Sequence, residues 1–501
     1  MLGGVSLSLS PESRVGLVGP NGIGKSTLLR ILAGLEEPDT GAVRRSPPSL
    51  AVGYLPQEHD VRPDETLRGY LARRTGVAEA EARLDALAQR LADEPSLAAD
   101  YADALDRFLA LGGDDLDARA AAVLAEVGLA AKPLDEPLAA LSGGEAARAA
   151  LAGILLARFD VFLLDEPTND LDFAGLALLE RFVADLRGAV LVVSHDRSFL
   201  DRTVTRIVEL DEGSRRAVEY GGGWSEYEAA QAAARRRHYD AYDVYVGERE
   251  RIETQLRRMQ QWEERGYGQG RKKKKTKDIR KAYAGRIKRL ERVEKPFEAW
   301  ELHLELGSQR RSGDVVARLE RAVVERGSFR LGPIDLAVGW RDRLAILGAN
   351  GSGKTTLLRA LLGELPLSAG RRTLGSGVVL GELEQERSRF AGGALLSEFV
   401  DAARIPPEDA RTLLAKFGLG ADDVHRAGAS LSPGERTRAT LALLAARGVN
   451  CLVLDEPTNH LDVPAIEELE SALARFDGTV LLVTHDRRFL ERFAATRTLE
   501  L

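Results

Sequence analysis

The sequence predicts an α/β protein in which two similar domains are joined by a helical hairpin. Three observations predict this fold class. The first is a glycine-rich stretch, GPNGIGKST at residues 19–27, which lies between the apolar run 14–18 and the helix-like run 28–32. The second is a repeat of that stretch, GANGSGKTT at residues 348–356, again after an apolar run. The third is a long, charged, nearly proline-free segment between the two copies.

Both glycine-rich stretches fit the phosphate-binding pattern G-x-x-x-x-G-K-[ST] in its required strand–loop–helix context. Glycines let backbone N–H groups turn toward phosphate oxygens, and the helix N-terminus adds a favourable dipole. The lysine reaches the β- and γ-phosphates, and the following hydroxyl is offered to Mg²⁺. A plain glycine-rich turn is the alternative for a single match, and the repeat argues against it. The predicted phosphate-contacting residues are Gly19, Pro20, Asn21, Gly22, Ile23, Gly24, Lys25, Ser26 and Thr27, then Gly348, Ala349, Asn350, Gly351, Ser352, Gly353, Lys354, Thr355 and Thr356.

Bulk composition indicates an ordinary globular protein. Apolar residues make up 44% of the 501 residues and charged residues 29%. The single cysteine, Cys451, lies in an apolar run, so we expect a core residue and no disulfide within the chain. The N-terminal residues show no signal-peptide pattern, and every apolar run is far shorter than a membrane span. We therefore expect a cytoplasmic protein without a membrane span.

The series of motifs after each glycine-rich stretch recurs in the same order. The first copy has YLPQ at 54–57, LSGGE at 141–145, DEPTNDLD at 165–172 and a His-Asp pair after the apolar run 190–194. In the second copy the matching serine, aspartate and histidine are all displaced by 290 positions. The first copy carries 38 extra residues between its glutamine and LSGGE, in the stretch 66–129, whose composition predicts several helices. A repeat of this length indicates a duplicated domain.

The segment between the copies predicts an antiparallel helical hairpin. Residues 224–264 contain no proline and a single glycine, and apolar residues follow at spacings of seven. After a glycine-containing break at 266–270, apolar residues return at spacings of three and four. At 1.5 Å per residue the first helix would extend about 60 Å. We therefore expect a first domain at 1–223, a hairpin linker at 224–312 and a second domain at 313–501.

Positive charge is concentrated in this hairpin, although the whole chain has a net charge of -7. Residues 231–300 hold 21 Lys and Arg against 11 Asp and Glu, and 8 of the 12 lysines lie in 272–295. A solvated surface turn is the alternative, but this concentration favours contact with a nucleic-acid backbone. The residues predicted to make that contact are Arg271, Lys272, Lys273, Lys274, Lys275 and Lys277.

The acidic and histidine motifs predict the chemistry of phosphate transfer. Carboxylates directly after buried strands are placed to hold Mg²⁺ near phosphates, and the next glutamate can deprotonate an attacking water. Single histidines at strand ends are more often structural, but two at equal spacing favour contact with the γ-phosphate. The predicted metal-contacting residues are Ser26, Gln57, Asp165, Thr355, Gln385 and Asp455, and the predicted catalytic residues are Glu166, Glu456, His195, His485, Gln57 and Gln385.

LSGGE and EPTN-x-LD resemble the signature and acidic motifs of the ATP-binding cassette ATPases. Two such domains on one chain, with a charged helical linker, resemble the ABC-F branch. The resemblance implies an ATPase that acts on ribosomes, with a hairpin that enters the tRNA exit site and contacts the tRNA in the peptidyl site. Members of that branch regulate translation or dislodge ribosome-targeting antibiotics.

The resemblance further implies that the two cassettes close head to tail, so that one chain completes both ATP sites and a monomer suffices. The signature residues Ser432 and Gly434 would face the first phosphate loop, and Ser142, Gly143 and Gly144 the second.

The sequence departs from the family pattern at two places. Pro433 replaces the first glycine of the second signature, and proline removes a backbone donor. Only 18 residues precede the first phosphate loop, of which 5–9 alternate as in a half-buried strand. Family members usually have an earlier strand with an aromatic residue that stacks on adenine. Phe329 is a candidate for that role at the second site, with core packing as the alternative.

Two other functional classes remain open on sequence alone. The ATPase subunit of a transporter with separate membrane chains would explain the two domains but not the basic hairpin. A DNA-binding cassette ATPase usually has longer coiled coils or zinc-binding cysteines, and this chain has one cysteine.

Overall fold

The computed structural model describes residues 2–48, 50–56, 62, 64–91, 93–211, 213, 215–265, 313–327, 329–383, 390, 392–459 and 461–501. The chain divides into two compact units, one formed by Met1–Trp224 with Leu302–Leu501 and the other by Ser225–Glu301. Within the described part, no helix combines the length and the apolar character that crossing a membrane requires.

The first lobe, residues 2–223, is built on a six-stranded sheet. Five strands are parallel, and the sixth, β6, runs antiparallel to β5 at one edge. The apolar runs predict these strands because a parallel sheet is covered on both faces. In sheet order the strands are β2 (Val52–Leu55), β3 (Val161–Asp165), β4 (Ala189–Val193), β1 (Arg14–Val18), β5 (Arg206–Leu210) and β6 (Ala217–Gly221).

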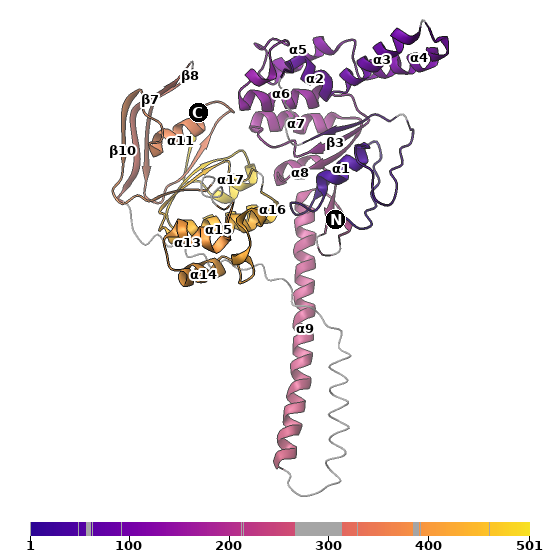
Figure 1. Ribbon diagram of the computed structural model, residues 1–501. Helices are drawn as coiled ribbons and strands as arrows, with labels where there is room; N and C mark the ends of the chain where they lie inside the picture. Colours follow the sequence, from indigo (N-terminus) through magenta and orange to yellow (C-terminus); the bar gives the residue numbers. More distant parts are fainter. Residues whose placement is uncertain are drawn as a thin grey trace. The chain divides into compact units, whose positions relative to one another are not determined.

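Helices follow most of these strands, and four helices fill the predicted helical stretch 66–129, which confirms that prediction. Helices α3 and α4 in that stretch pack against each other (Figure 1). The α-helices are α1 (Lys25–Ala33), α2 (Leu67–Arg74), α3 (Val77–Leu91), α4 (Ala98–Ala110), α5 (Leu116–Glu126), α6 (Gly143–Leu156), α7 (Phe173–Asp185) and α8 (Arg197–Thr203), with 3₁₀ turns at Pro95–Leu97 and Leu138–Ala140.

The second lobe, residues 313–501, repeats the parallel sheet with the same strand order. Cys451 is buried in its strand β12, as expected of a core residue. The sheet runs β11 (Leu380–Glu382), β12 (Cys451–Asp455), β13 (Thr479–Val483), β9 (Arg343–Leu347) and β14 (Arg497–Glu500). Its α-helices are α11 (Lys354–Leu362), α13 (Leu395–Ala403), α14 (Pro407–Lys416), α15 (Pro433–Ala446), α16 (Val463–Arg475) and α17 (Arg487–Phe493), with 3₁₀ turns at Asp423–His425 and Gly428–Ser430.

This lobe also has a separate antiparallel sheet of three strands, β10 (Ala369–Leu374), β7 (Val315–Arg326) and β8 (Phe329–Gly339). Its position in the repeat matches residues 5–9 of the first lobe, for which a strand was predicted. That prediction is wrong, since residues 5–9 form no strand. Val5, Leu7 and Leu9 still pack against the core, because alternation fixes the buried face, whereas a strand also needs a hydrogen-bonding partner.

The predicted first helix of the linker is confirmed by α9, which runs unbroken over Trp224–Arg265 (Figure 1). It carries an i,i+4 ion pair between Arg249 and Glu253. The predicted second helix and the basic stretch 271–277 lie outside the described residues.

Candidate nucleotide-binding sites

Each phosphate loop ends at a glycine in the left-handed conformation, and the helix begins at the next residue. Gly24 precedes α1 with φ 110°, and Gly353 precedes α11 with φ 104°. Neither helix start has a side-chain cap, so its first N–H groups stay available for an anion. The sequence needs glycine here because other residues rarely adopt this conformation.

The loop lysines fold back over their own loops. Lys25 Nζ donates to the carbonyl oxygens of Gly19 at 2.7 Å and Pro20 at 3.2 Å. Lys354 Nζ donates to Gly348 at 2.9 Å and Ala349 at 3.0 Å. Burial lowers the pKa of both lysines, opposed by the neighbouring acidic residues. Each loop is therefore centred on one positive charge.

Both predicted general bases have a strained backbone. Glu166 and Glu456 directly follow β3 and β12 and have φ values of 50° and 48°. Such a conformation costs about 1–3 kcal/mol for a residue other than glycine and is concentrated at functional sites. The same strained conformation thus recurs at the matching residue of both cassettes.

Each of these glutamates meets the histidine of its own cassette that was predicted to contact the γ-phosphate. His195 donates its backbone N–H to Glu166 Oε2 at 3.2 Å, and its Nε2 lies 3.3 Å from Glu166 Oε1. His485 and Glu456 repeat this geometry at 3.2 Å and 3.4 Å. Burial, with the charge of the neighbouring lysine, lowers the pKa of His195 to about 3 and of His485 to about 4. Both imidazoles are therefore neutral at pH 7.

Glu456 differs from an ordinary glutamate in its ionisation. Burial raises its pKa to about 7, against the opposing effect of Lys354. A carboxyl group whose pKa is near the working pH suits general-base catalysis, since it holds and releases a proton readily.

The predicted metal-contacting aspartates are each held by one hydroxyl donor. Asp165 Oδ2 accepts from the Tyr54 hydroxyl at 3.0 Å, and Asp455 Oδ2 accepts from Thr355 Oγ1 at 2.7 Å. Burial, together with Asp165, raises the pKa of Tyr54, so that this phenol remains a donor. Sequence reasoning missed Tyr54, although its place two residues before a strand-end proline and glutamine was a usable signal.

The two lobes touch each other through the phosphate loops and acidic motifs. Asn350 donates from its backbone to Asp172 Oδ2 at 2.9 Å and from Nδ2 to the Asp170 carbonyl at 2.6 Å. The reciprocal bond, from the Asn21 backbone to Asp462 Oδ2, is 3.3 Å. A Cβ added to Gly144 would lie 3.3 Å from Asn350 Cβ, so the first signature reaches the second loop.

Three cavities lie around these contacts. The first loop lines a cavity of about 390 Å³ with Asp165, Glu166 and His195, joined by Thr458 and Leu461 of the second lobe. The second loop lines one of about 410 Å³ with Asp455, Glu456, Phe329 and Arg326. A third, of about 450 Å³, contains Gly143 and Gly144 together with Asn350, Gly351 and His485. Ser432 and Gly434 are not among the residues that line the first-loop cavity.

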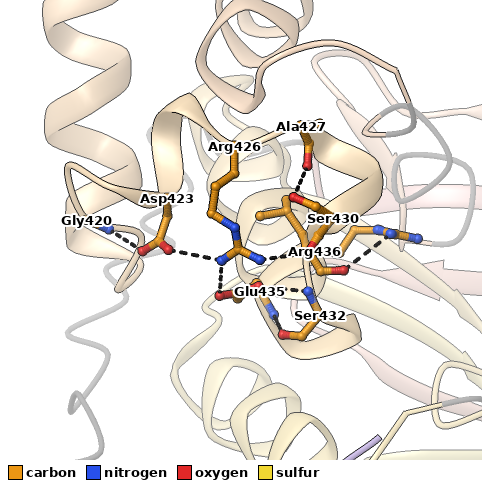
Figure 2. A network of polar contacts seen from close by, with 9 residues as sticks. Gly420, Asp423, Arg426, Ala427, Ser430, Ser432, Glu435 and Arg436 are labelled. Carbon is orange, nitrogen blue, oxygen red and sulfur yellow. Dashed lines mark hydrogen bonds and ion pairs between the residues drawn. The ribbon is translucent and has the colours of Figure 1, made fainter. Parts of the chain in front are cut away.

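The signature helices begin with a full capping box in both lobes. Ser142 caps α6 with Glu145, and Ser432 caps α15 with Glu435. Figure 2 shows the Arg426 guanidinium between the carboxylates of Asp423 and Glu435, at 3.2 Å and 2.8 Å. Pro433 is the first residue of α15, where its missing N–H breaks no intrahelical bond, so the substitution leaves the helix start intact.

A reciprocal set of ion pairs across the lobes was not predicted. Arg197 of α8 pairs with Glu470 of α16, and Arg487 of α17 pairs with Glu180 of α7. Each glutamate also meets an arginine of its own lobe, Arg492 or Arg202. The 290-residue offset relates the arginines to one another and the glutamates to one another, and this was the signal in the sequence.

The residues present fit a divalent cation that is bound mainly through nucleotide phosphates. Asp165 with Ser26, and Asp455 with Thr355, would supply hard oxygen ligands of the kind that Mg²⁺ prefers. Among the described residues, no three His, Cys, Asp or Glu side chains group as metal ligands. Gln57, Gln385, Arg271 and the lysines at 272–275 and 277 lie outside the described residues.

Comparison with known proteins decides the family. The profile of the family described as ABC transporter matches residues 2–169 and 331–459. The chain belongs to the ATP-binding cassette family. The two lobes are its cassettes, and the near full-length similarities that follow group the chain with the ABC-F proteins.

The chain is 38% identical over 523 residues to the tylosin resistance ATP-binding protein TlrC of Streptomyces fradiae, which covers 99% of this chain and 94% of that protein. It is 35% identical over 526 residues to the energy-dependent translational throttle protein EttA of Escherichia coli K12, which covers 99% of this chain and 88% of that protein. The solved structure of RNase-L Inhibitor matches with a TM-score of 0.59 at 22% identity over 98% of this chain and 84% of that chain. That likeness supports the tandem-cassette fold.

Proposed function

We propose that this protein hydrolyses ATP at two sites and acts on the ribosome. The observation that carries hydrolysis is the duplicated cluster in which a strained glutamate lies between a phosphate loop and a neutral histidine. Glu166 and Glu456 take the proton of the attacking water, and His195 and His485 fix their carboxylates. When bound with ATP, Mg²⁺ would neutralise phosphate charge beside Asp165 and Asp455.

The proposed partner follows from the relatives and from the charge of the linker. One relative is a translational throttle and another confers resistance to an antibiotic, and both match this chain from end to end. The excess of Lys and Arg in 231–300 suits ribosomal RNA and the peptidyl-site tRNA. A monomer acting in the cytoplasm, where ribosomes are, satisfies these requirements. Regulation of translation and ribosome-protecting antibiotic resistance both follow from this one partner.

Hydrolysis and ribosome binding are tested together by changing Glu166 and Glu456 to Gln. The double variant should bind ATP but turn it over at least about a hundredfold more slowly, because it lacks the general bases. It should sediment with ribosomes in ATP. Near-parental turnover would refute the assignment of the bases, and co-purification with membranes or preferential binding to duplex DNA would favour the two rival classes.

The contact with RNA is tested by replacing Lys272, Lys273, Lys274, Lys275 and Lys277 with Gln in the same double variant. Ribosome binding should weaken, and its salt dependence should become shallower, because fewer counterions are released. In a chain that carries the lysine changes but keeps Glu166 and Glu456, ATP turnover without ribosomes should stay unchanged. If the lysine variant and its parent sediment equally with ribosomes at both low and high salt, these lysines form only a solvated turn.

A further inference from the structure

The two cassettes hold their strand-end aspartates with different donors. In the first cassette, Tyr54 lies on β2 opposite Leu163 of β3, and its hydroxyl reaches two residues further to Asp165 Oδ2 at 3.0 Å. Asp165 is only 3% exposed, so a bond to its carboxylate is not exchanged easily with water. The bond therefore sets the orientation of a buried carboxylate at the edge of the phosphate cavity.

The same place in the second cassette is occupied by a carboxylate. Glu382 of β11 lies opposite Val453 of β12, as Tyr54 lies opposite Leu163, and each partner precedes its aspartate by two residues. Strand alternation puts Tyr54 and Glu382 on equivalent faces of their sheets. An ionised carboxylate only accepts hydrogen bonds, so Glu382 cannot replace the phenol as a donor. Asp455 accepts instead from Thr355 of its own phosphate loop, at 2.7 Å.

We propose that Tyr54 is a positioning residue for the divalent cation of the first site, acting through Asp165. A fixed carboxylate loses less freedom when it becomes a ligand, so the first site reaches its cation-binding geometry with help from outside the phosphate loop. The second site has no equivalent phenol and depends on the loop hydroxyl of Thr355. The inference rests on the proposed binding of ATP with Mg²⁺, and it makes the two sites differ in how they acquire the cation.

The test reports on cation binding at the first site alone. The full-length chain carries Glu166→Gln and Glu456→Gln, so that it does not hydrolyse ATP. It also carries Lys354→Ala, which weakens the second site, so that binding of a fluorescent ATP analogue reports on the first site. The free Mg²⁺ concentration for half-maximal analogue binding is then measured. Tyr54→Phe should raise it about tenfold, the size expected for one hydrogen bond to a charged group. Binding in EDTA should not change, since the phosphate loop is intact.

A matched control removes a similar bond elsewhere on the same sheet. Tyr220 of β6 hydrogen bonds to Glu209 of the neighbouring strand β5, and neither residue lines the first-loop cavity. Tyr220→Phe should leave the Mg²⁺ requirement unchanged. A Mg²⁺ requirement that is the same for Tyr54→Phe, Tyr220→Phe and the parent would overturn the proposal.

Action through Asp165 is tested by a double-mutant cycle. With Asp165→Asn, Tyr54→Phe should add no further shift to the Mg²⁺ requirement, because the carboxylate it positions is gone. An equal shift in both backgrounds would overturn the proposal. A parent that fails to bind the analogue under any condition would refute the proposed function and not the role of Tyr54.

The converse change tests the idea without touching Tyr54. Glu382→Tyr and Glu382→Phe differ by one hydroxyl beside Asp455, and they are compared in a chain whose first site is weakened by Lys25→Ala. The tyrosine variant should bind the analogue at a several-fold lower free Mg²⁺ concentration than the phenylalanine variant. Equal requirements in the two variants would contradict the positioning role.

Discussion

The first cassette ends its sheet with the antiparallel strand β6, whereas the second builds a separate three-stranded sheet beside its phosphate loop. From that sheet Phe329 and Leu331 reach the second loop, where a Cβ added to Gly353 would lie 2.8 Å from Phe329 Cζ. At the first loop the corresponding neighbour of Gly24 is Leu2, at 3.4 Å. The same phosphate-loop motif is thus covered by an aromatic ring in the second cassette and by a leucine in the first.

The surroundings of the two signatures also differ. Glu145 in the first pairs with Lys132 at 3.2 Å, while Glu435 in the second is held by the planar fork of Arg426, which also donates to the Ser430 carbonyl (Figure 2). Across the lobes, the second loop makes the shorter bonds, 2.6 Å and 2.9 Å against 3.3 Å. The comparison teaches that duplicated chemistry is supported by unequal packing, and that the second phosphate loop has the closer packing and the shorter bonds to the other lobe.

The largest expected effect is a difference in stability between variants of the two reciprocal ion pairs. Arg197 and Glu470 have side chains 0% and 5% exposed, while Arg487 and Glu180 are 21% and 17% exposed. Arg197→Met leaves a buried carboxylate with a weaker partner and should destabilise the first unfolding transition by about 3 kcal/mol. The matched Arg487→Met should cost about 1 kcal/mol, because water screens that pair.

Thermal or urea unfolding without nucleotide measures both variants of this pair. The parallel Glu470→Gln and Glu180→Gln changes are the controls, and they should show the same order with smaller losses. Equal destabilisation by Arg197→Met and Arg487→Met would mean that the unequal burial has no energetic consequence.

Sequence patterns could predict the strands, the phosphate loops and the strand-end Asp–Glu pairs, because each depends on local periodicity or on a motif within about ten residues. Residues 5–9 show the limit, since alternation specifies a buried face but not the presence of a pairing strand. Tyr54, Arg197 and Glu470 were missed because their partners lie 111 and 273 positions away in the chain.

The next largest effect concerns the two general bases separately. We expect Glu456→Gln to lower ATP turnover about tenfold and Glu166→Gln only a few-fold, because the second site, with its more closely packed phosphate loop, carries most of the turnover. Steady-state phosphate release from the two single variants, at saturating ATP, makes the comparison. Equal losses would show that neither the packing around Phe329 nor the signature proline distinguishes the sites.

The smallest effect is a pH dependence assigned to one carboxyl group. In a Glu166→Gln chain the second site works alone, and its base Glu456 has a pKa of about 7 because it is buried. A protonated carboxyl cannot accept the proton of water, so kcat/KM should be about half-maximal near pH 7 and rise toward pH 8.5. His485, with a pKa of about 4, does not titrate in this range.

Stability should follow the opposite direction with pH. The folded-state pKa of Glu456 lies above that of an unfolded glutamate, so the protonated form favours folding. That contribution is fully present below the unfolded pKa, about 4.3, and is lost as the pH rises through about 7. Glu456→Gln should therefore gain stability relative to its parent between pH 5 and 8, as measured by the midpoint of thermal unfolding.

The Glu456→Gln chain with Glu166 intact is also the control for the kinetic pH profile, because the ionisation of ATP itself affects both sites. If its kcat/KM rises with the same midpoint near pH 7, the titration does not belong to Glu456 alone, and the assignment to this carboxyl group is wrong.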